Sequence, residues 1–148
     1  MEDNIIGTVA LTDFADIYKL FLSKITNYEF LYYTEEELED CFIDYLRTAL
    51  ARFVQLEITP DYTTKTFDRE LTHLEQDIIT TFMITHWLSG YINSVSLLKQ
   101  SLSSKDFSFY SQSQHLKQAI DLRNLTEKEA TYWAGRYSLI NMTRNGGF

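Results

Sequence analysis

The stretch TEEELEDCFIDYLRTALARF, residues 34–53, carries the clearest helix signature in the chain. Thr34 followed three residues later by Glu37 is a capping box, in which the hydroxyl accepts a first-turn amide and the carboxylate reaches back. Behind the box, apolar side chains recur at the spacing of one helix face: Leu38, Cys41, Phe42, Tyr45, Leu46, Ala49 and Phe53. The stretch predicts an amphipathic helix that begins after Thr34.

The segment before this helix predicts another one. Its apolar residues also share one helix face: Phe14, Ile17, Tyr18, Phe21 and Ile25. Asp13 and Asp16 fall in the first turn, where the helix dipole favours anions. We expect a helix from near Thr12 to residues 26–27, preceded by a flexible N-terminus over residues 1–11.

Residues 56–70, LEITPDYTTKTFDRE, form the least regular stretch. Pro60 cannot occupy a helix interior, and the threonines around it suit turns or a short β excursion. We expect an exposed loop here, in which a small hairpin is possible.

A second capping box, Thr72 with Glu75, opens the next helix. The residues that follow are apolar on more than one side: Leu74, Ile78, Ile79, Phe82, Met83, Ile84, Trp87 and Leu88. A helix of this kind belongs in the middle of a bundle. Ser89-Gly90 is expected to end or kink it, and Tyr91–Gln100 then forms a short helix of its own.

The last long segment begins around Asp106–Ser108. Seven of its residues recur at threes, fours and sevens, as on one face of a helix: Phe109, Leu116, Ile120, Arg123, Ala130, Ala134 and Tyr137. Thr126 with Glu129 offers another capping box and hence a possible break near Leu125. Between Ser108 and Leu139 there is no proline and only one glycine, so the sequence favours one continuous helix.

The tail Asn141–Phe148, NMTRNGGF, ends in a phenylalanine after two glycines and is expected to form an extended C-terminal arm. The whole chain, residues 1–148, predicts one all-α domain. Its architecture is a bundle of four to five helices with one long C-terminal helix.

Composition narrows the classes of function. The 148 residues carry a net charge of −8, which argues against binding a nucleic-acid backbone and fits either plain solubility or a passage through which DNA slides. Aromatic residues make up 15 % of the chain, so some of them are expected at interfaces with other chains or on a tyrosine-rich surface. Cys41 is the only cysteine, and no segment has the pattern of a signal peptide or a membrane span.

The sequence contains no recognisable motif for catalysis, metal binding or phosphate binding. The three histidines, His73, His86 and His115, stand in no metal-ligand pattern, and His86 is more typical of a hydrogen-bonded core residue. The acidic run Glu35–Asp40 is explained by its position at a helix N-terminus. Cys41 is expected to be a small, buried, apolar side chain. Neither glycine-rich phosphate loops nor GxSxG occur, and basic residues are scattered. We therefore expect no enzyme, no cofactor, no metal and no specific DNA binding.

Four stretches together resemble a family of head–tail connector proteins, also called adaptor or neck proteins, of tailed bacteriophages. They are FLSKITNYEFL at residues 21–31, EEELEDCFIDYLRTALARF at 35–53, HWLSGYINSVSLLKQ at 86–100 and SKDFSFYSQSQHLKQAIDLRNL at 104–125. The most distinctive matches are Trp87-Leu88 and Lys105-Asp106-Phe107.

The resemblance implies a non-enzymatic structural protein of the virion neck, assembled in the host cytoplasm. Copies of such proteins form a ring, commonly twelve-fold, beneath the portal protein, and the ring binds the next neck or tail-completion protein. Genomic DNA passes through the ring without specific binding, and twelve copies of this chain would carry about −96 in total. The C-terminal arm of the family generally engages the portal, which assigns that role to Asn141, Met142, Thr143, Arg144, Asn145, Gly146, Gly147 and Phe148.

The alternative that the residues leave open is an acidic helical protein with a regulatory or host-interaction role.

Overall fold

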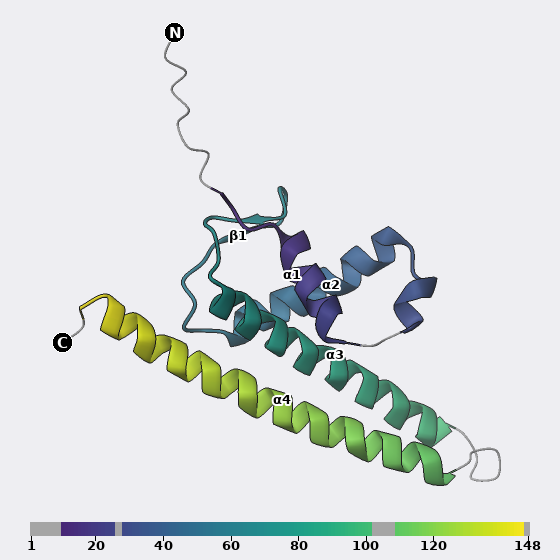
Figure 1. Cartoon of the computed structure of the whole chain (residues 1–148). Helices are drawn as coiled ribbons and strands as arrows, with labels where there is room; N and C mark the ends of the chain where they lie inside the picture. The colour runs from purple at the N-terminus through teal and green to yellow at the C-terminus, as the bar shows by residue number, and fades with distance from the viewer. Residues whose placement is uncertain (1–9, 26–27, 102–108, 147–148) are drawn as a thin grey trace.

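The computed structural model describes residues 10–25, 28–101 and 109–146 of the chain. The described residues form α1 (Phe14–Lys24), the 3₁₀ helix η1 (Tyr28–Tyr32), α2 (Glu35–Arg52), β1 (Pro60–Asp61), β2 (Thr66–Phe67), α3 (His73–Ser101) and α4 (Phe109–Arg144) (Figure 1). The all-α class expected from the sequence is confirmed, with one long C-terminal helix, and the described residues include a small two-stranded hairpin beside the helices.

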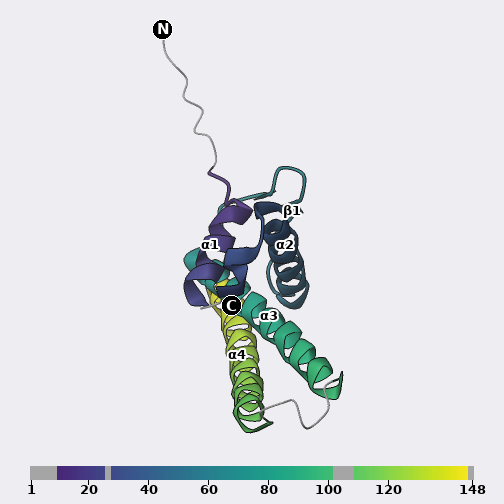
Figure 2. The ribbon, with the colours of Figure 1, turned by 90° about the vertical axis from the view of Figure 1, so that its right-hand side faces the viewer.

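Helix α3 is the centre of the arrangement. Helices α1 and α2 pack against it, and α4 runs antiparallel along it as the other arm of a long helical hairpin (Figure 1). The view turned by 90° shows α1 and α2 gathered at one end of this hairpin (Figure 2). This position explains why the start of α3 is apolar on more than one side, as the sequence predicted.

The helix starts follow the predicted capping residues. The Glu37 amide donates to the Thr34 hydroxyl (3.2 Å), and the Thr34 amide donates to the Glu37 carboxylate (2.8 Å). The same reciprocal pair joins Glu75 and Thr72, at 3.2 and 2.8 Å. Both capping boxes are confirmed, and they set the first residues of α2 and α3.

The stretch 56–70 contains the small hairpin that the sequence allowed, with β1 and β2 antiparallel. The stretch is not exposed throughout, because Phe67 is buried and its ring lies 5.0 Å from that of Phe14. The Phe67 amide also donates to the Thr12 carbonyl (2.9 Å), and the Phe14 amide to the Lys65 carbonyl (2.9 Å). The hairpin is therefore fixed to the start of α1.

The helix break expected at Ser89-Gly90 is wrong, because α3 continues through both residues to Ser101. The Ser89 hydroxyl donates to the Thr85 carbonyl one turn earlier (3.0 Å), so this serine is accommodated within the helix. Gly90 is exposed, and a single glycine costs a helix only about 1 kcal/mol, which good flanking residues outweigh.

The boundary expected at Asn141 is also corrected. Helix α4 is continuous, as predicted, but it runs on to Arg144, so residues 141–144 belong to the helix and not to an extended arm. None of these four residues is proline or glycine, and Arg144 in the last turn is favoured by the helix dipole. Gly146 has a φ of +69° and supplies the left-handed residue that commonly follows a helix end.

Candidate functional site

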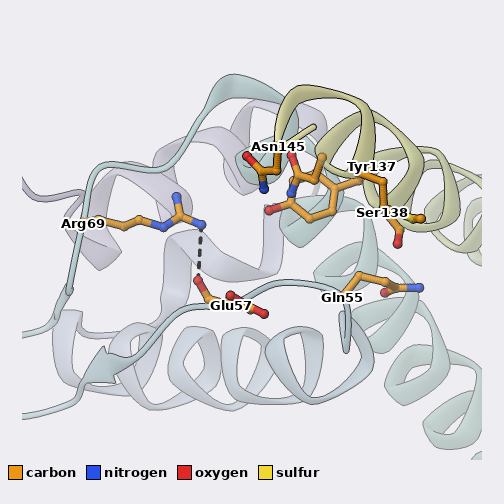
Figure 3. A pocket seen from close by; sticks show the side chains of 8 residues that line it. Gln55, Glu57, Arg69, Tyr137, Ser138 and Asn145 are labelled. Carbon is orange, nitrogen blue, oxygen red and sulfur yellow. Dashed lines mark hydrogen bonds between the residues drawn. The ribbon is translucent and has the colours of Figure 1, made fainter. Parts of the chain in front are cut away.

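Two neighbouring surface hollows of the described structure lie at the C-terminal end of α4, where it meets the segment after α2 and the start of α3. One open hollow of about 490 Å³ is lined by Gln55, Glu57, Arg69, Tyr137, Ser138, Asn141, Met142 and Asn145 (Figure 3). A second, of about 560 Å³, shares Arg69, Tyr137, Asn141 and Asn145 with it and adds residues of the α3 N-terminus. The shared residues form the wall between the two hollows.

Three side chains join the elements that meet here, and we refer to them as the Arg69–Glu75–Tyr137 joint. Arg69 donates from both terminal nitrogens to Glu75, at 2.8 Å to Oε1 and 2.6 Å to Oε2. The Tyr137 hydroxyl donates to the same Oε2 at 2.7 Å, across 62 positions of sequence. Arg69 also donates to the backbone carbonyls of Glu57 (3.3 Å) and Glu70 (3.2 Å). The joint therefore ties α4 to α3 and to the segment before α3.

These contacts determine the protonation states of the three side chains in the joint. Burial alone raises the pKa of Glu75, but hydrogen bonds from Arg69, the Thr72 amide and Tyr137 outweigh it and hold the pKa of Glu75 at about 2. The bond to Glu75 raises the pKa of Arg69 above its ordinary value, and burial raises the pKa of Tyr137. At neutral pH the joint is a carboxylate, a guanidinium and a neutral phenol.

This arrangement holds three chain segments together. The Glu75 carboxylate is ionised and takes four hydrogen bonds, so it is a poor candidate for a general acid or base near neutral pH. The groups left around the hollows include the amides of Gln55, Asn141 and Asn145 and the hydroxyl of Ser138. Amides both donate and accept hydrogen bonds, which suits a polypeptide segment as the bound group.

Of the residues predicted to bind a portal protein, Asn141–Arg144 lie at this end as the last turn of α4, and Asn145 and Gly146 follow the helix. Asn141 and Asn145 line both hollows, Met142 lines the first and Arg144 the second. Thr143 is exposed, and its hydroxyl donates to the Leu139 carbonyl (3.0 Å). Gly146 follows the end of the helix. Gly147 and Phe148 lie outside the described residues.

Sequence reasoning found Glu75 only as a capping residue and missed Arg69 and Tyr137 as its partners. The sequence included Tyr137 in the periodic row of the last helix, and the structure buries it, at 6 % exposed. Arg69 had no signal in the sequence, because a single arginine in a polar loop shows no periodicity that could indicate its partner.

The histidines and the cysteine give weaker indications of a functional site. His86 is half-buried, with its Nε2 3.1 Å from the Asp44 carboxylate, so it is hydrogen-bonded as expected, whereas His73 and His115 are exposed. Burial, followed by the charges of neighbouring acids, raises the pKa of the Cys41 thiol, which makes it a weak nucleophile. The described residues contain no cluster of His, Cys, Asp or Glu that could hold a metal ion.

A membrane span was not expected, and no helix within the described ranges combines the length and the apolar character needed to cross a bilayer.

Comparisons of the chain with protein-family models, with curated proteins and with solved structures found no match.

Proposed function

We propose that this chain is a structural, non-enzymatic protein of a tailed bacteriophage particle. In this proposal it is a head–tail connector that attaches beneath the portal protein and forms a ring with neighbouring copies. The ring extends the DNA channel toward the next neck or tail-completion protein.

The distribution of the resembling stretches supports the proposal. The first covers the end of α1 and η1, the second α2, the third the latter half of α3, and the fourth the first half of α4. The resemblance therefore involves all four α-helices of the described structure and not one isolated helix.

The proposal rests on one observation, that the C-terminal end of α4 is held in place beside the two hollows. The Arg69–Glu75–Tyr137 joint fixes this end, so Asn141, Met142 and Asn145 are held beside the two hollows instead of moving freely. A pre-positioned binding element loses less conformational freedom when it docks, which strengthens binding. We assign portal contact to this end of α4 together with the residues that follow it.

The charge of the chain supports the channel role. A ring of copies that each carry −8 repels DNA from its walls, so DNA passes without being held.

The test is a binding experiment with the portal protein of the phage from which this chain comes. We expect the mixture to form rings visible by electron microscopy, and we expect Met142→Glu to abolish attachment. Met142 is 47 % exposed, so the substitution changes the docking surface and leaves the circular dichroism and melting temperature nearly unchanged. Mixtures without rings count against the proposal.

Leu97→Glu is the matched control, since Leu97 is 67 % exposed and lies near the C-terminal end of α3, which ends at Ser101. It should attach like the wild type. Mass spectrometry of purified particles separates the proposal from the regulatory alternative, because a regulator is absent from virions.

A further inference from the structure

The outer face of α4 carries a regular row of exposed apolar side chains. Leu125, Tyr132 and Leu139 are 64, 59 and 55 % exposed and are spaced seven residues apart. Residues at this spacing share one face of a helix, as in the seam of a coiled coil. Along most of its length α4 lies beside α3, and no other described element covers this outer face (Figures 1 and 2).

Two opposite charges stand within the row. Glu129 and Arg136 are exposed, lie seven residues apart, and form no ion pair with any described residue. Glu129 comes three residues before Tyr132 and Arg136 four residues after it. Leu125 and Leu139 lie at equal distances on the two sides of Tyr132. We refer to Leu125, Glu129, Tyr132, Arg136 and Leu139 as the α4 stripe. Their positions are nearly symmetric about Tyr132, and the charge before Tyr132 is opposite to the charge after it.

We propose that two copies of this chain pair through the α4 stripe, antiparallel, with Tyr132 at the two-fold axis. In this alignment Leu125 meets Leu139 of the second copy, because both lie about 10 Å along the helix from Tyr132. Glu129 meets Arg136 of the second copy with an offset of one residue, about 1.5 Å. This Glu129–Arg136 ion pair forms twice in the dimer, by symmetry.

The charges select this alignment over the parallel one. A parallel pair in register sets Glu129 against Glu129 and Arg136 against Arg136, and like charges at an interface are strongly unfavourable. Aromatic contact favours the axis at Tyr132, whose ring already lies 5.4 Å from the half-exposed ring of Trp133.

The proposed dimer is weak, and its two-fold symmetry prevents the addition of further copies through the same face. The α4 stripe provides far fewer residues than the roughly 20–30 a side of a standard interface, so association requires micromolar or higher concentrations. A two-fold contact uses the same face of both copies, so it does not extend into a ring. This inference does not depend on the proposed connector function, and the two are tested by different experiments.

The experiment is sedimentation velocity on the full chain between about 1 µM and 1 mM. We expect a monomer–dimer equilibrium in the wild type. Glu129→Arg alone and Arg136→Glu alone should each weaken dimerisation at least about tenfold, because each creates two like-charge contacts per pair. The control Lys117→Glu, an exposed change of the same kind outside the α4 stripe, should leave the equilibrium unchanged.

Restoration is the decisive readout. The double variant Glu129→Arg with Arg136→Glu should dimerise again, because the charges are exchanged in both copies. An equimolar mixture of the two single variants should form a heterodimer, in which both contacts pair opposite charges. Circular dichroism of every variant verifies folding, which changes at exposed sites should not affect.

A wild type that remains monomeric over the whole range overturns the proposal, and so does a dimer that the single charge changes leave intact. Failure of the double variant and of the mixture to dimerise, after the single changes have abolished pairing, also overturns it. None of these outcomes bears on ring formation with the portal protein, which is measured separately.

Discussion

Two regions of the molecule are packed by different means. Between α1, α2 and α3 the core is made of large rings, and Phe21 alone lies within 5.6 Å of Phe42, 5.7 Å of Tyr45 and 6.4 Å of Trp87, measured between ring centroids. In the α3–α4 seam, the side chains that α4 buries are mainly small: Thr126, Ala130, Ala134 and Tyr137. The views in Figures 1 and 2 show this seam extending away from the aromatic core.

The difference assigns different tasks to the two regions. Large rings from three helices bury much apolar surface, so the aromatic core supplies most of the stability of the fold. Alanines let α3 and α4 approach closely but bury little surface each, so the position of α4 depends on its length and on the Arg69–Glu75–Tyr137 joint at its end. The aromatic core should therefore control global unfolding, and the seam should control the placement of α4.

The largest expected effect is in the aromatic core. Phe21→Ala removes a fully buried ring and should lower the free energy of unfolding by about 3–5 kcal/mol. Urea denaturation followed by circular dichroism measures the loss. Leu31→Ala, at a residue 78 % exposed, is the control and should change stability by less than about 0.5 kcal/mol. A small loss for Phe21→Ala would place the stability of the fold elsewhere.

The next effect concerns the joint. Glu75 is 2 % exposed, and its pKa of about 2 lies below the ordinary value of 4.5. A carboxyl group whose pKa is lower in the folded state stabilises the fold fully above its unfolded pKa, and this stabilisation is lost as the pH falls toward its folded pKa. It amounts to on the order of 3 kcal/mol at pH 7 and is lost between about pH 4.5 and 2.

Glu75→Gln should therefore destabilise the chain most at pH 7, and the difference from the wild type should shrink as the pH falls through that window. Urea denaturation at a series of pH values measures both curves. Glu70→Gln, at an exposed carboxylate next to Arg69, should run parallel to the wild type. A pH-independent loss in Glu75→Gln would mean that the side chain acts through its shape and not through its charge.

The local patterns of the sequence predicted the fold well. The boxes at Thr34 and Thr72 fixed two helix starts, because a capping interaction spans only three residues and is visible in the sequence. The spacing of Phe14, Ile17 and Phe21 identified the buried face of α1 for the same reason. The break expected at Ser89-Gly90 is wrong, since the small local cost of one glycine is outweighed by the rest of a long helix.

The candidate site was predicted only in part. The last residues of the chain were assigned a binding role, and their helix ends beside the hollows, but the joint that fixes this end was not visible. Arg69, Glu75 and Tyr137 meet only because a loop, a helix start and a distant helix come together in space. Contacts of this kind depend on the tertiary arrangement, which no periodicity records.

A smaller effect should appear in the seam. Ala130 is fully buried, and Ala130→Leu adds volume where α3 and α4 are close, which should cost about 1–3 kcal/mol. Hydrogen exchange should show faster exchange in α4 and little change in α1 and α2. Thr131→Leu, at the exposed neighbouring residue, is the control. Equal acceleration in all helices would show that the seam and the aromatic core unfold as one unit.

The smallest effect tests the helix that the sequence expected to break. A Cβ added at Gly90 meets no atom within 4 Å, and the backbone there is helical, so Gly90→Ala should raise the free energy of unfolding by about 0.4–1 kcal/mol. Gly146→Ala is the matched comparison and should be destabilising, because φ is +69° and only the backbone conformation disfavours a side chain there. Thermal unfolding of both variants measures the difference. A loss of stability in Gly90→Ala would mean that α3 needs flexibility at this position, since neither space nor backbone conformation opposes the added methyl group.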